Sequence, residues 1–361
     1  MATGTFRLVP SPREKHLSDR FFGRFRKVGL SGVLADLNRA ADRVDVPSSV
    51  AADGLRWEEH DVRSRRWYPQ GVTTSADAYG ADPSAGTFDG RQVVMTSWYG
   101  HGVVGRLFLG TRISVVDLTD PGVPRYRHVL LAAPVKRMGL HWLRPVRVHA
   151  GGIVWYGRHL FVAGSSGGIR VFRLDDIVRV RNRWRTKGYR YVLPQLTRYT
   201  ADHDDGVLPM TYSFMSLDRA GEVDHLVAGE YGRAGGSHRL VRYALDRGTE
   251  LLHTGEREVA EPVEMFERQI PRMQGAALVD GTWVVTASTG KGNPGDLWVG
   301  VPDAFVRRRG VLPTGPEDIT YWPQRRQFWT LTEWPGRRWV YAIDADPLLR
   351  TEEPTATPGS N

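Results

Sequence analysis

Short runs of mostly apolar residues alternate with turn residues along most of the chain, and the stretch 272–298 shows this pattern most clearly. One run covers 274–279, the dipeptide Asp280-Gly281 follows, and a second run covers 283–288. Asp-Gly between two apolar runs predicts a hairpin, because the tight turn needs a positive φ that glycine adopts freely. A loop rich in Gly, Asn and Pro comes next, and we expect a third strand to open at Asp296.

Similar units recur along the chain. The second strand of each unit is predicted to start near Val93, Leu160, Leu226, Trp283 and Phe328. Third strands end on an apolar-x-apolar-Asp pattern at Asp175, Asp246 and Asp344. Four strands repeated around an axis are the way in which a β-propeller avoids exposed sheet edges. The chain resembles the β-propeller superfamily over residues 55–346, which implies an all-β fold, and the count of units favours a five-bladed β-propeller.

The fifth unit lacks an obvious fourth strand. The segment 55–62, LRWEEHDV, could close the ring by pairing with the last blade. A sixth blade built partly from residues 55–69 is the competing count.

Residues 1–54 are predicted to form an N-terminal helical extension. Residues 1–14 are expected to be flexible, and apolar positions at roughly helical spacing over 16–44 predict two short amphipathic helices. The Pro-rich polar segment 347–361 is expected to be a disordered tail.

Composition supports many short strands and narrows the classes of partner. The chain has 12 Trp, 13 Tyr, 12 Phe, 40 Gly and 22 Pro, residues that favour strands and turns. The net charge is +9, but the arginines are scattered along predicted strands, which indicates solvated faces and no nucleic-acid partner. The absence of cysteine excludes thiolate chemistry.

The chain has no apolar run long enough to cross a membrane as a helix. We expect a cytoplasmic protein, with secretion of a longer precursor as the alternative. The sequence does not indicate an oligomeric state.

Propeller geometry places the start of each first strand on the same face as the loops between strands two and three. The aligned starts are Gln70, Ala150, Tyr212, Gln274 and Glu317. His149 and Glu317 are the titratable residues of this axial mouth, so they are the predicted catalytic pair, able to divide the acid and base roles. Asp318 follows Glu317 and is a further candidate for ligand binding.

Loops on the same face carry additional candidates for contact with a small polar or aromatic ligand. These residues are Tyr99, His101, Glu230, Tyr231, Lys291, Glu333 and Trp334. Aromatic side chains among them could stack on a sugar or another flat ring.

His203-Asp204-Asp205 is the one compact cluster of metal-type ligands in the sequence. His203, Asp205 and Asp318 are the candidates for holding one divalent cation, because oxygen ligands suit hard cations and adjacent side chains diverge.

The function follows less directly from the sequence than the fold. Motifs such as HExxH, GxSxG and the phosphate-binding P-loop are absent. Propeller glycosidases carry three axial carboxylates, and most of the aligned positions here are not acidic. Two hypotheses remain, a small-molecule-processing enzyme of hydrolase, lyase or cyclase type, or a non-catalytic binding or scaffold protein.

Overall fold

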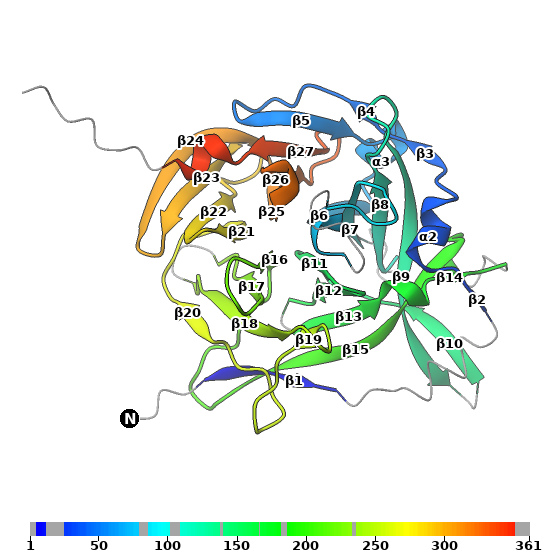
Figure 1. Cartoon of the computed structure of the whole chain (residues 1–361), viewed down its shortest axis with the longest axis horizontal. Helices are drawn as coiled ribbons and strands as arrows, with labels where there is room; N and C mark the ends of the chain where they lie inside the picture. Colours follow the sequence, from blue (N-terminus) through cyan, green and yellow to red (C-terminus); the bar gives the residue numbers. More distant parts are fainter. Residues whose placement is uncertain are drawn as a thin grey trace, which may run out of the picture.

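The strands form blades around a central axis, with the inner strands surrounding the centre in Figure 1. The computed structural model describes residues 5–11, 25–78, 86–101, 109–137, 140–165, 167–181, 186–232 and 236–350. The first unit consists of β6 (Trp67–Thr74), β7 (Val93–Gly100), β8 (Thr111–Asp117) and β9 (Arg125–Arg137). The second unit consists of β11 (Ile153–Tyr156), β12 (His159–Ala163), β13 (Ile169–Arg173) and β15 (Tyr191–His203). Neighbouring strands within each unit pair antiparallel, and β15 also pairs parallel with β9.

Three further units complete the ring. The third has β16 (Phe214–Asp218), β17 (His225–Gly229) and β18 (Leu240–Asp246), with outer strands β19 (Leu251–Leu252) and β20 (Glu264–Phe266). The fourth has β21 (Met273–Val279), β22 (Thr282–Ala287), β23 (Pro294–Val301) and β24 (Ala304–Thr314). The fifth has β25 (Pro316–Trp322), β26 (Gln327–Thr332), β27 (Trp339–Asp344) and, from the start of the chain, β5 (Ala51–Arg56). This arrangement confirms the predicted all-β propeller fold.

The ring is closed by β5, which pairs antiparallel with β27 and places Arg56 opposite Trp339. The closing strand therefore lies earlier in the chain than the predicted segment 55–62 and overlaps it only at Leu55 and Arg56. The second half of that segment forms helix α3 (Glu59–Arg63), because Glu59 forms ion pairs with Arg56 and Arg63 at helical spacing and the Asp61 and Val62 side chains face the interior.

The N-terminal segment differs from the predicted pair of helices. Strand β1 (Phe6–Pro10), within the segment predicted to be flexible, pairs with β15 and buries Phe6 and Leu8. The helix in the described part of the segment is α2 (Gly29–Leu34), whose Leu30, Val33 and Leu34 pack into the core. Residues 1–4 and 12–24 lie outside the described residues.

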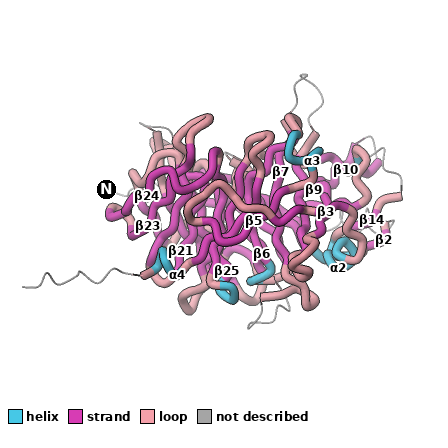
Figure 2. The backbone as a smooth tube through the Cα atoms, turned by 90° about the horizontal axis from the view of Figure 1, so that it is seen from above, coloured by secondary structure: helices cyan, strands magenta, loops and turns pink. Residues whose placement is uncertain are grey.

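The remaining elements are short. They are strands β2 (Arg26–Lys27), β3 (Arg39–Ala40), β4 (Asp42–Arg43), β10 (Leu140–Pro145) and β14 (Val178–Arg179), 3-10 helices η1 (Ser75–Asp77), η2 (Leu174–Asp176) and η4 (Pro323–Arg325), and helix α4 (Asp346–Leu349). Figure 2 shows the disc from its edge, with α3 at one face and α2 and α4 at the other. The predicted disorder of the tail falls largely on residues 351–361, outside the described residues. Within the described part of the chain, no helix is long and apolar enough to cross a membrane.

The inner strands approach each other so closely that glycine is required between them. A Cβ on Gly152 would lie 2.0 Å from the backbone nitrogen of Met215, and a Cβ on Gly275 would lie 2.5 Å from that of Ile319. Backbone atoms at these distances cannot move aside without shifting a whole blade. The axis is therefore closely packed at these positions.

Candidate functional site

Three of the five inner strands begin with a β-bulge. The register shifts between Pro69 and Val72 in β6, between Met273 and Gly275 in β21, and between Pro316 and Ile319 in β25. A bulge bends its strand and redirects a side chain. The residues within these bulges include Gln70, Gln274 and Glu317, three of the side chains predicted to line the axial mouth.

These three side chains converge. The Gln274 amide Nε2 donates a hydrogen bond to Glu317 Oε1 at 3.3 Å, and Gln70 Nε2 donates one to Glu333 Oε2 at 3.0 Å. Glu333 follows β26 and forms a side-chain hydrogen bond with Glu317. The centre of the mouth is therefore a carboxyl pair held between two amides.

The two carboxyl groups titrate differently. Glu317 is 3% exposed, and its burial, together with the charges of Glu333 and Asp318, raises its pKa well above the usual value. Burial raises the pKa of Glu333, which is partly exposed, to about 7. Two carboxylates this close cannot both ionise cheaply. Near neutral pH the pair therefore shares one proton, with Glu317 as its main holder.

A buried arginine fixes the loop that carries Glu333. Arg338 is 1% exposed, and its Nε donates to the Glu333 backbone oxygen at 2.7 Å. Its Nη1 donates to the Asp61 backbone oxygen at 2.6 Å. Burial lowers the Arg338 pKa to about 10, so the guanidinium stays charged at neutral pH and opposes the rise in the pKa of Glu333.

Aromatic rings surround the carboxyl pair. The Tyr99 ring stacks on His149, with centroids 4.4 Å apart, and on Tyr68 at 5.5 Å. Trp334 meets the Tyr68 ring edge-on at 6.5 Å, and His101 does so at 6.1 Å. Burial and the charges of Glu333 and Glu317 raise the pKa of the Tyr99 hydroxyl, which places this ring beside the pair.

Beside the predicted catalytic pair of His149 and Glu317, the structure shows a second titratable neighbour of Glu317. The His149 ring stacks on Tyr99, His149 as a residue is exposed, and burial of the imidazole lowers its pKa. The hydrogen-bonded titratable partner of Glu317 is Glu333, which the sequence placed near the mouth without assigning it to the pair. The sequence feature that placed Glu333 near the mouth was its position directly after the second strand of the last blade.

Two other predicted ligand contacts have structural roles. Tyr212 is fully buried, and its hydroxyl lies 2.8 Å from that of Tyr243. Glu230 is 2% exposed and forms a two-pronged ion pair with Arg239, both contacts being 2.8 Å. Although burial opposes it, the hydrogen bonds from Arg239 and Ser237 lower the pKa of Glu230. Both side chains hold the third blade together and are not available to a ligand.

Two candidates lie at the rim of the mouth. Tyr231 is partly buried and uses its backbone NH to donate to Ser213 Oγ at 3.0 Å. The Lys291 ammonium lies 5.9 Å from the Trp334 ring centroid.

Asp318 joins inner strands of different blades. Its Oδ2 accepts hydrogen bonds from the backbone NH groups of Val72 in β6, at 3.1 Å, and Ile153 in β11, at 3.3 Å. The side chain is fully buried, and its Oδ1 has no hydrogen-bond partner among the described residues. Burial raises its pKa well above the usual value, while the amide hydrogen bonds oppose the rise. Asp318 is therefore a structural link across the axis.

The predicted cation ligands are not brought together. His203 ends β15, an outer strand of its blade, and Asp205 follows it, whereas Asp318 lies on the innermost strand of another blade. The neighbouring Asp204 accepts hydrogen bonds from the Thr5 backbone and from Arg7. Among the described residues, no group of three or more His, Asp or Glu side chains is arranged to hold a metal ion.

A chain of hydrogen bonds links a serine and a histidine of the first blade to an aspartate of helix α3. Ser114 Oγ is 2.9 Å from His128 Nδ1, and His128 Nε2 is 3.0 Å from Asp61 Oδ2. The Trp98 indole donates to Ser114 Oγ at 2.7 Å, and the serine is fully buried. A substrate cannot reach this hydroxyl, so this chain of hydrogen bonds is a structural network and not a nucleophilic triad.

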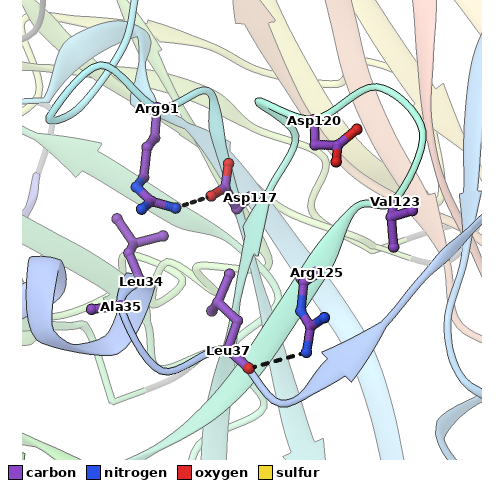
Figure 3. Close-up of a pocket in the computed structure, with 8 residues that line it drawn as sticks. All are labelled: Leu34, Ala35, Leu37, Arg91, Asp117, Asp120, Val123 and Arg125. Atoms are coloured by element: carbon purple, nitrogen blue, oxygen red, sulfur yellow. Dashed lines mark hydrogen bonds and ion pairs between the residues drawn. The ribbon is translucent and has the colours of Figure 1, made fainter.

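Two surface depressions lie outside the mouth. The smaller, of about 520 Å³, is on the face of the tight turns and includes Arg91, Asp117 and Arg125 (Figure 3). Arg91 forms an ion pair with Asp117, and Arg125 Nη2 donates to the Leu37 backbone oxygen at 3.4 Å. Its charged groups are thus largely satisfied within the protein. The larger depression, of about 780 Å³, includes Glu59, Arg63 and Tyr189 in its lining, and Glu59 forms an ion pair with Arg63.

Comparison with protein-family models and with curated proteins gave no match. The β-propeller domain of Myceliophteria thermophila Cps50 (Swd1) is similar with a TM-score of 0.37 and 9% identity, over 78% of this chain and 97% of that one. A GH43_1 enzyme from Xanthomonas citri complexed with xylotriose has a TM-score of 0.34 and 12% identity, over 78% of this chain and 88% of that one. Extracellular domains 1–2 of Drosophila Semaphorin 1b have a TM-score of 0.29 and 9% identity, over 76% and 86%. These similarities indicate no function, and on its own sheet topology the chain is a β-propeller.

Proposed function

We propose that the protein is a small-molecule-processing enzyme, a hydrolase in its simplest form, with its active site at the axial mouth. The observation that carries the proposal is the hydrogen-bonded pair Glu317 and Glu333, in which the pKa of Glu333 is about 7. A general base works best when its pKa lies near the pH of the reaction. One protonated and one ionisable carboxyl group provide an acid and a base at the same point.

The two residues have distinct roles in the proposed hydrolysis. The carboxylate of Glu333, the more exposed member, accepts a proton from water while the water oxygen bonds to the carbonyl carbon of an ester or lactone. Glu317 then donates its proton to the leaving alcohol oxygen as the carbon–oxygen bond breaks. Transfer of a proton from Glu333 back to Glu317 through their hydrogen bond restores the starting state.

The geometry disfavours glycosidase chemistry. In most glycosidases two carboxyl groups flank the scissile bond at about 5–9.5 Å from each other. Here Glu317 and Glu333 hydrogen-bond to each other directly. The pair is therefore better suited to activating one water molecule than to enclosing a sugar linkage.

The surroundings favour an uncharged, polar or flat substrate. Tyr68, Tyr99, His149 and Trp334 provide ring faces and edges for stacking. Gln70 and Gln274 provide amide groups beside the carboxyl pair. A carboxylate at the centre of the site repels anionic ligands.

The test is hydrolysis of a panel of 4-nitrophenyl esters and aliphatic lactones by the wild-type protein and by Glu317→Gln and Glu333→Gln. Loss of a general acid or base is expected to lower kcat by about a hundredfold or more, while the thermal midpoint changes little. The matched control is Glu222→Gln, at an exposed position of the third blade, which keeps full activity. Wild-type rates in either mouth variant would overturn the assignment, and hydrolysis of no panel member would count against a hydrolase.

The alternative is a non-catalytic binding protein that uses the same mouth. The low exposure of Gln70 and Glu317, 1% and 3%, favours this alternative. The polar side-chain atoms of both residues are already hydrogen-bonded to neighbouring side chains, Gln70 to Glu333 and Glu317 to Gln274. A binding protein would retain ligand affinity in Glu317→Gln, which preserves the hydrogen-bonding shape and removes only the transferable proton.

A further inference from the structure

The sheets of the first and second blades are joined by a direct pairing of strands. Ala132 of β9 pairs with Pro194 of β15 in parallel register and with Pro145 of β10 in antiparallel register. Because one residue has one partner on each edge of its strand, β9 lies between β15 and β10 at this point. The joint therefore brings outer strands of two blades close together.

Three arginines meet beside this joint. Arg170 of β13 lies directly opposite Arg198 of β15 in the antiparallel register. Burial, together with the positive charges of Arg198 and of Arg144 on β10, lowers the pKa of Arg170. The three guanidinium groups thus act on one another, and we call them the arginine cluster.

The direction of the Arg170 side chain agrees with this grouping. Residues two apart in a strand lie on the same face of the sheet, so Arg170 shares a face with Phe172. Phe172 is fully buried in a core that includes Leu131 of the first blade. Arg170 therefore lies on the side of its sheet that faces the first blade, which carries Arg144.

The partners of the arginine cluster are uncharged. The Arg170 Nη1 donates to Gln195 Oε1 at 2.5 Å, and the Arg198 Nε donates to Ser11 Oγ at 3.1 Å. Within the described ranges of the chain, no carboxylate forms an ion pair with Arg144, Arg170 or Arg198. The positive charge of the cluster is therefore not compensated by these residues.

Such a cluster is costly without a counterion. Like charges directly opposite each other in a sheet destabilise it, and an arginine side chain does not lose its proton at neutral pH. Elsewhere in the fold a partly buried guanidinium has a carboxylate partner, as Arg242 has in Asp218 at 2.6 Å. A bound anion would remove the repulsion between Arg170 and Arg198.

Neutral donors border the arginine cluster. Gln195 uses its Oε1 to accept from Arg170, which leaves its amide Nε2 to donate to a ligand. The Ser11 Oγ accepts from Arg198, so its hydroxyl hydrogen is directed away from that guanidinium. The surroundings therefore consist of N–H and O–H donors, which suits a ligand group made of acceptor oxygens.

We propose that the arginine cluster binds the phosphate group of a small phosphorylated molecule. A phosphate monoester carries nearly two negative charges at neutral pH and has three acceptor oxygens. Guanidinium groups match the geometry of phosphate oxygens and form charge-assisted hydrogen bonds with them. The cluster is built on outer strands, whereas the axial mouth is built on inner ones, so the proposal does not depend on the proposed enzyme function.

The experiment is isothermal titration calorimetry of the full chain with methyl phosphate, inorganic sulfate and acetate at neutral pH and constant ionic strength. Methyl phosphate is expected to bind at least about tenfold more tightly than acetate, because its second charge adds charge-assisted contacts. Arg144→Gln and Arg198→Gln, both at exposed positions, should each weaken the methyl phosphate complex by about tenfold.

Thermal unfolding provides a second readout. Methyl phosphate should raise the thermal midpoint of the wild type, because it binds the folded state. Without ligand, Arg198→Gln should unfold at a higher temperature than the wild type, since it removes the repulsion across the strand pair. The same variant should show a smaller shift on addition of methyl phosphate.

Two controls locate the effect. Arg309→Gln makes the same charge change at an exposed position of β24 in the fourth blade and is expected to keep the wild-type affinity. Glu317→Gln alters the axial mouth and should also keep it, which separates this proposal from the proposed enzyme function.

Several results would overturn the proposal. These are no binding of methyl phosphate, equally tight binding of acetate, or an equal loss of affinity in Arg309→Gln. Tighter binding of sulfate than of methyl phosphate would assign the cluster to a sulfated ligand instead. Tighter binding of a single-stranded oligonucleotide, lost in Arg198→Gln, would assign it to nucleic acid.

Discussion

The carboxyl groups of Glu317 and Glu333 hydrogen-bond to each other at the open end of the β25–β26 hairpin. Their proximity follows from strand register, because Pro316 lies opposite Thr332, Glu317 follows Pro316 within the bulge of β25, and Glu333 directly follows Thr332. The bulge in β25 turns Glu317 towards the axis, and Arg338 holds the backbone of Glu333. A local feature of one hairpin thus produces the central chemistry of the mouth.

The first prediction concerns the pH dependence of stability. The pKa of Glu333 is about 7 in the folded protein, above its ordinary value of 4.5. The folded state therefore binds more protons between these values, and the free energy of unfolding falls as pH rises through 7. The loss is on the order of 3 kcal/mol at most, since one pKa unit corresponds to about 1.4 kcal/mol.

Urea unfolding between about pH 5 and pH 8.5 measures this effect. Glu333→Gln should show a flatter profile than the wild type and be the more stable of the two at the alkaline end. Glu222→Gln should follow the wild type. A parallel profile for Glu333→Gln would show that this carboxyl group does not titrate in the expected range.

The second prediction concerns the axial link at Asp318. Asp318→Ala leaves the backbone NH groups of Val72 and Ile153 without their acceptor, which should cost about 2–4 kcal/mol of stability. Asp318→Asn keeps one acceptor oxygen for both groups and should cost less than about 1 kcal/mol. Chemical denaturation of both variants checks the order. Equal losses would mean that volume, and not hydrogen bonding, is the main contribution of this side chain.

The third prediction concerns the close approach of the inner strands. In Gly152→Ala the new Cβ would lie 2.0 Å from the Met215 nitrogen, in contact with backbone that cannot rotate away. The variant should lose more than about 3 kcal/mol or fail to fold. In Gly255→Ala nothing lies within 4 Å of the new atom, and stability should change by less than about 1 kcal/mol. Thermal unfolding of the pair decides whether the axis is as closely packed as described.

The fourth prediction concerns the buried network around Asp61. Its carboxylate accepts hydrogen bonds from Arg112 at 2.8 Å and from the Tyr126 hydroxyl at 2.7 Å, and lies 3.0 Å from His128. Asp61→Asn leaves the buried Arg112 cation unbalanced, so the variant should lose about 3–5 kcal/mol.

Asp42→Asn, at an exposed position, is the matched control and should be close to neutral. Burial and the Arg112 charge lower the His128 pKa to about 3, so this imidazole is neutral in the folded protein at neutral pH. If Asp61→Asn and Asp42→Asn have the same denaturation midpoint, the Asp61 network does not stabilise the fold.

The sequence by itself determined the class of fold and the general position of the mouth. Period-two alternation and turn pairs such as Asp280-Gly281 are local signals, because side-chain direction and positive φ depend on nearest neighbours. The alignment of the first-strand starts grouped Gln70, Gln274 and Glu317, and in the structure Gln274 hydrogen-bonds to Glu317 while Gln70 hydrogen-bonds to Glu333. Repetition of one unit makes such alignment possible without knowledge of long-range contacts.

The tertiary structure decided which of these side chains are free and which are committed. Glu230 is committed to Arg239, and Tyr212 to Tyr243, through packing between strands. The partner of Glu317 depends on hairpin register and on the bulge in β25, and the closing strand depends on how β5 meets β27. The hydrogen bonds and the burial that set each pKa arise only when separate strands meet, so no pattern within a single strand could have predicted them.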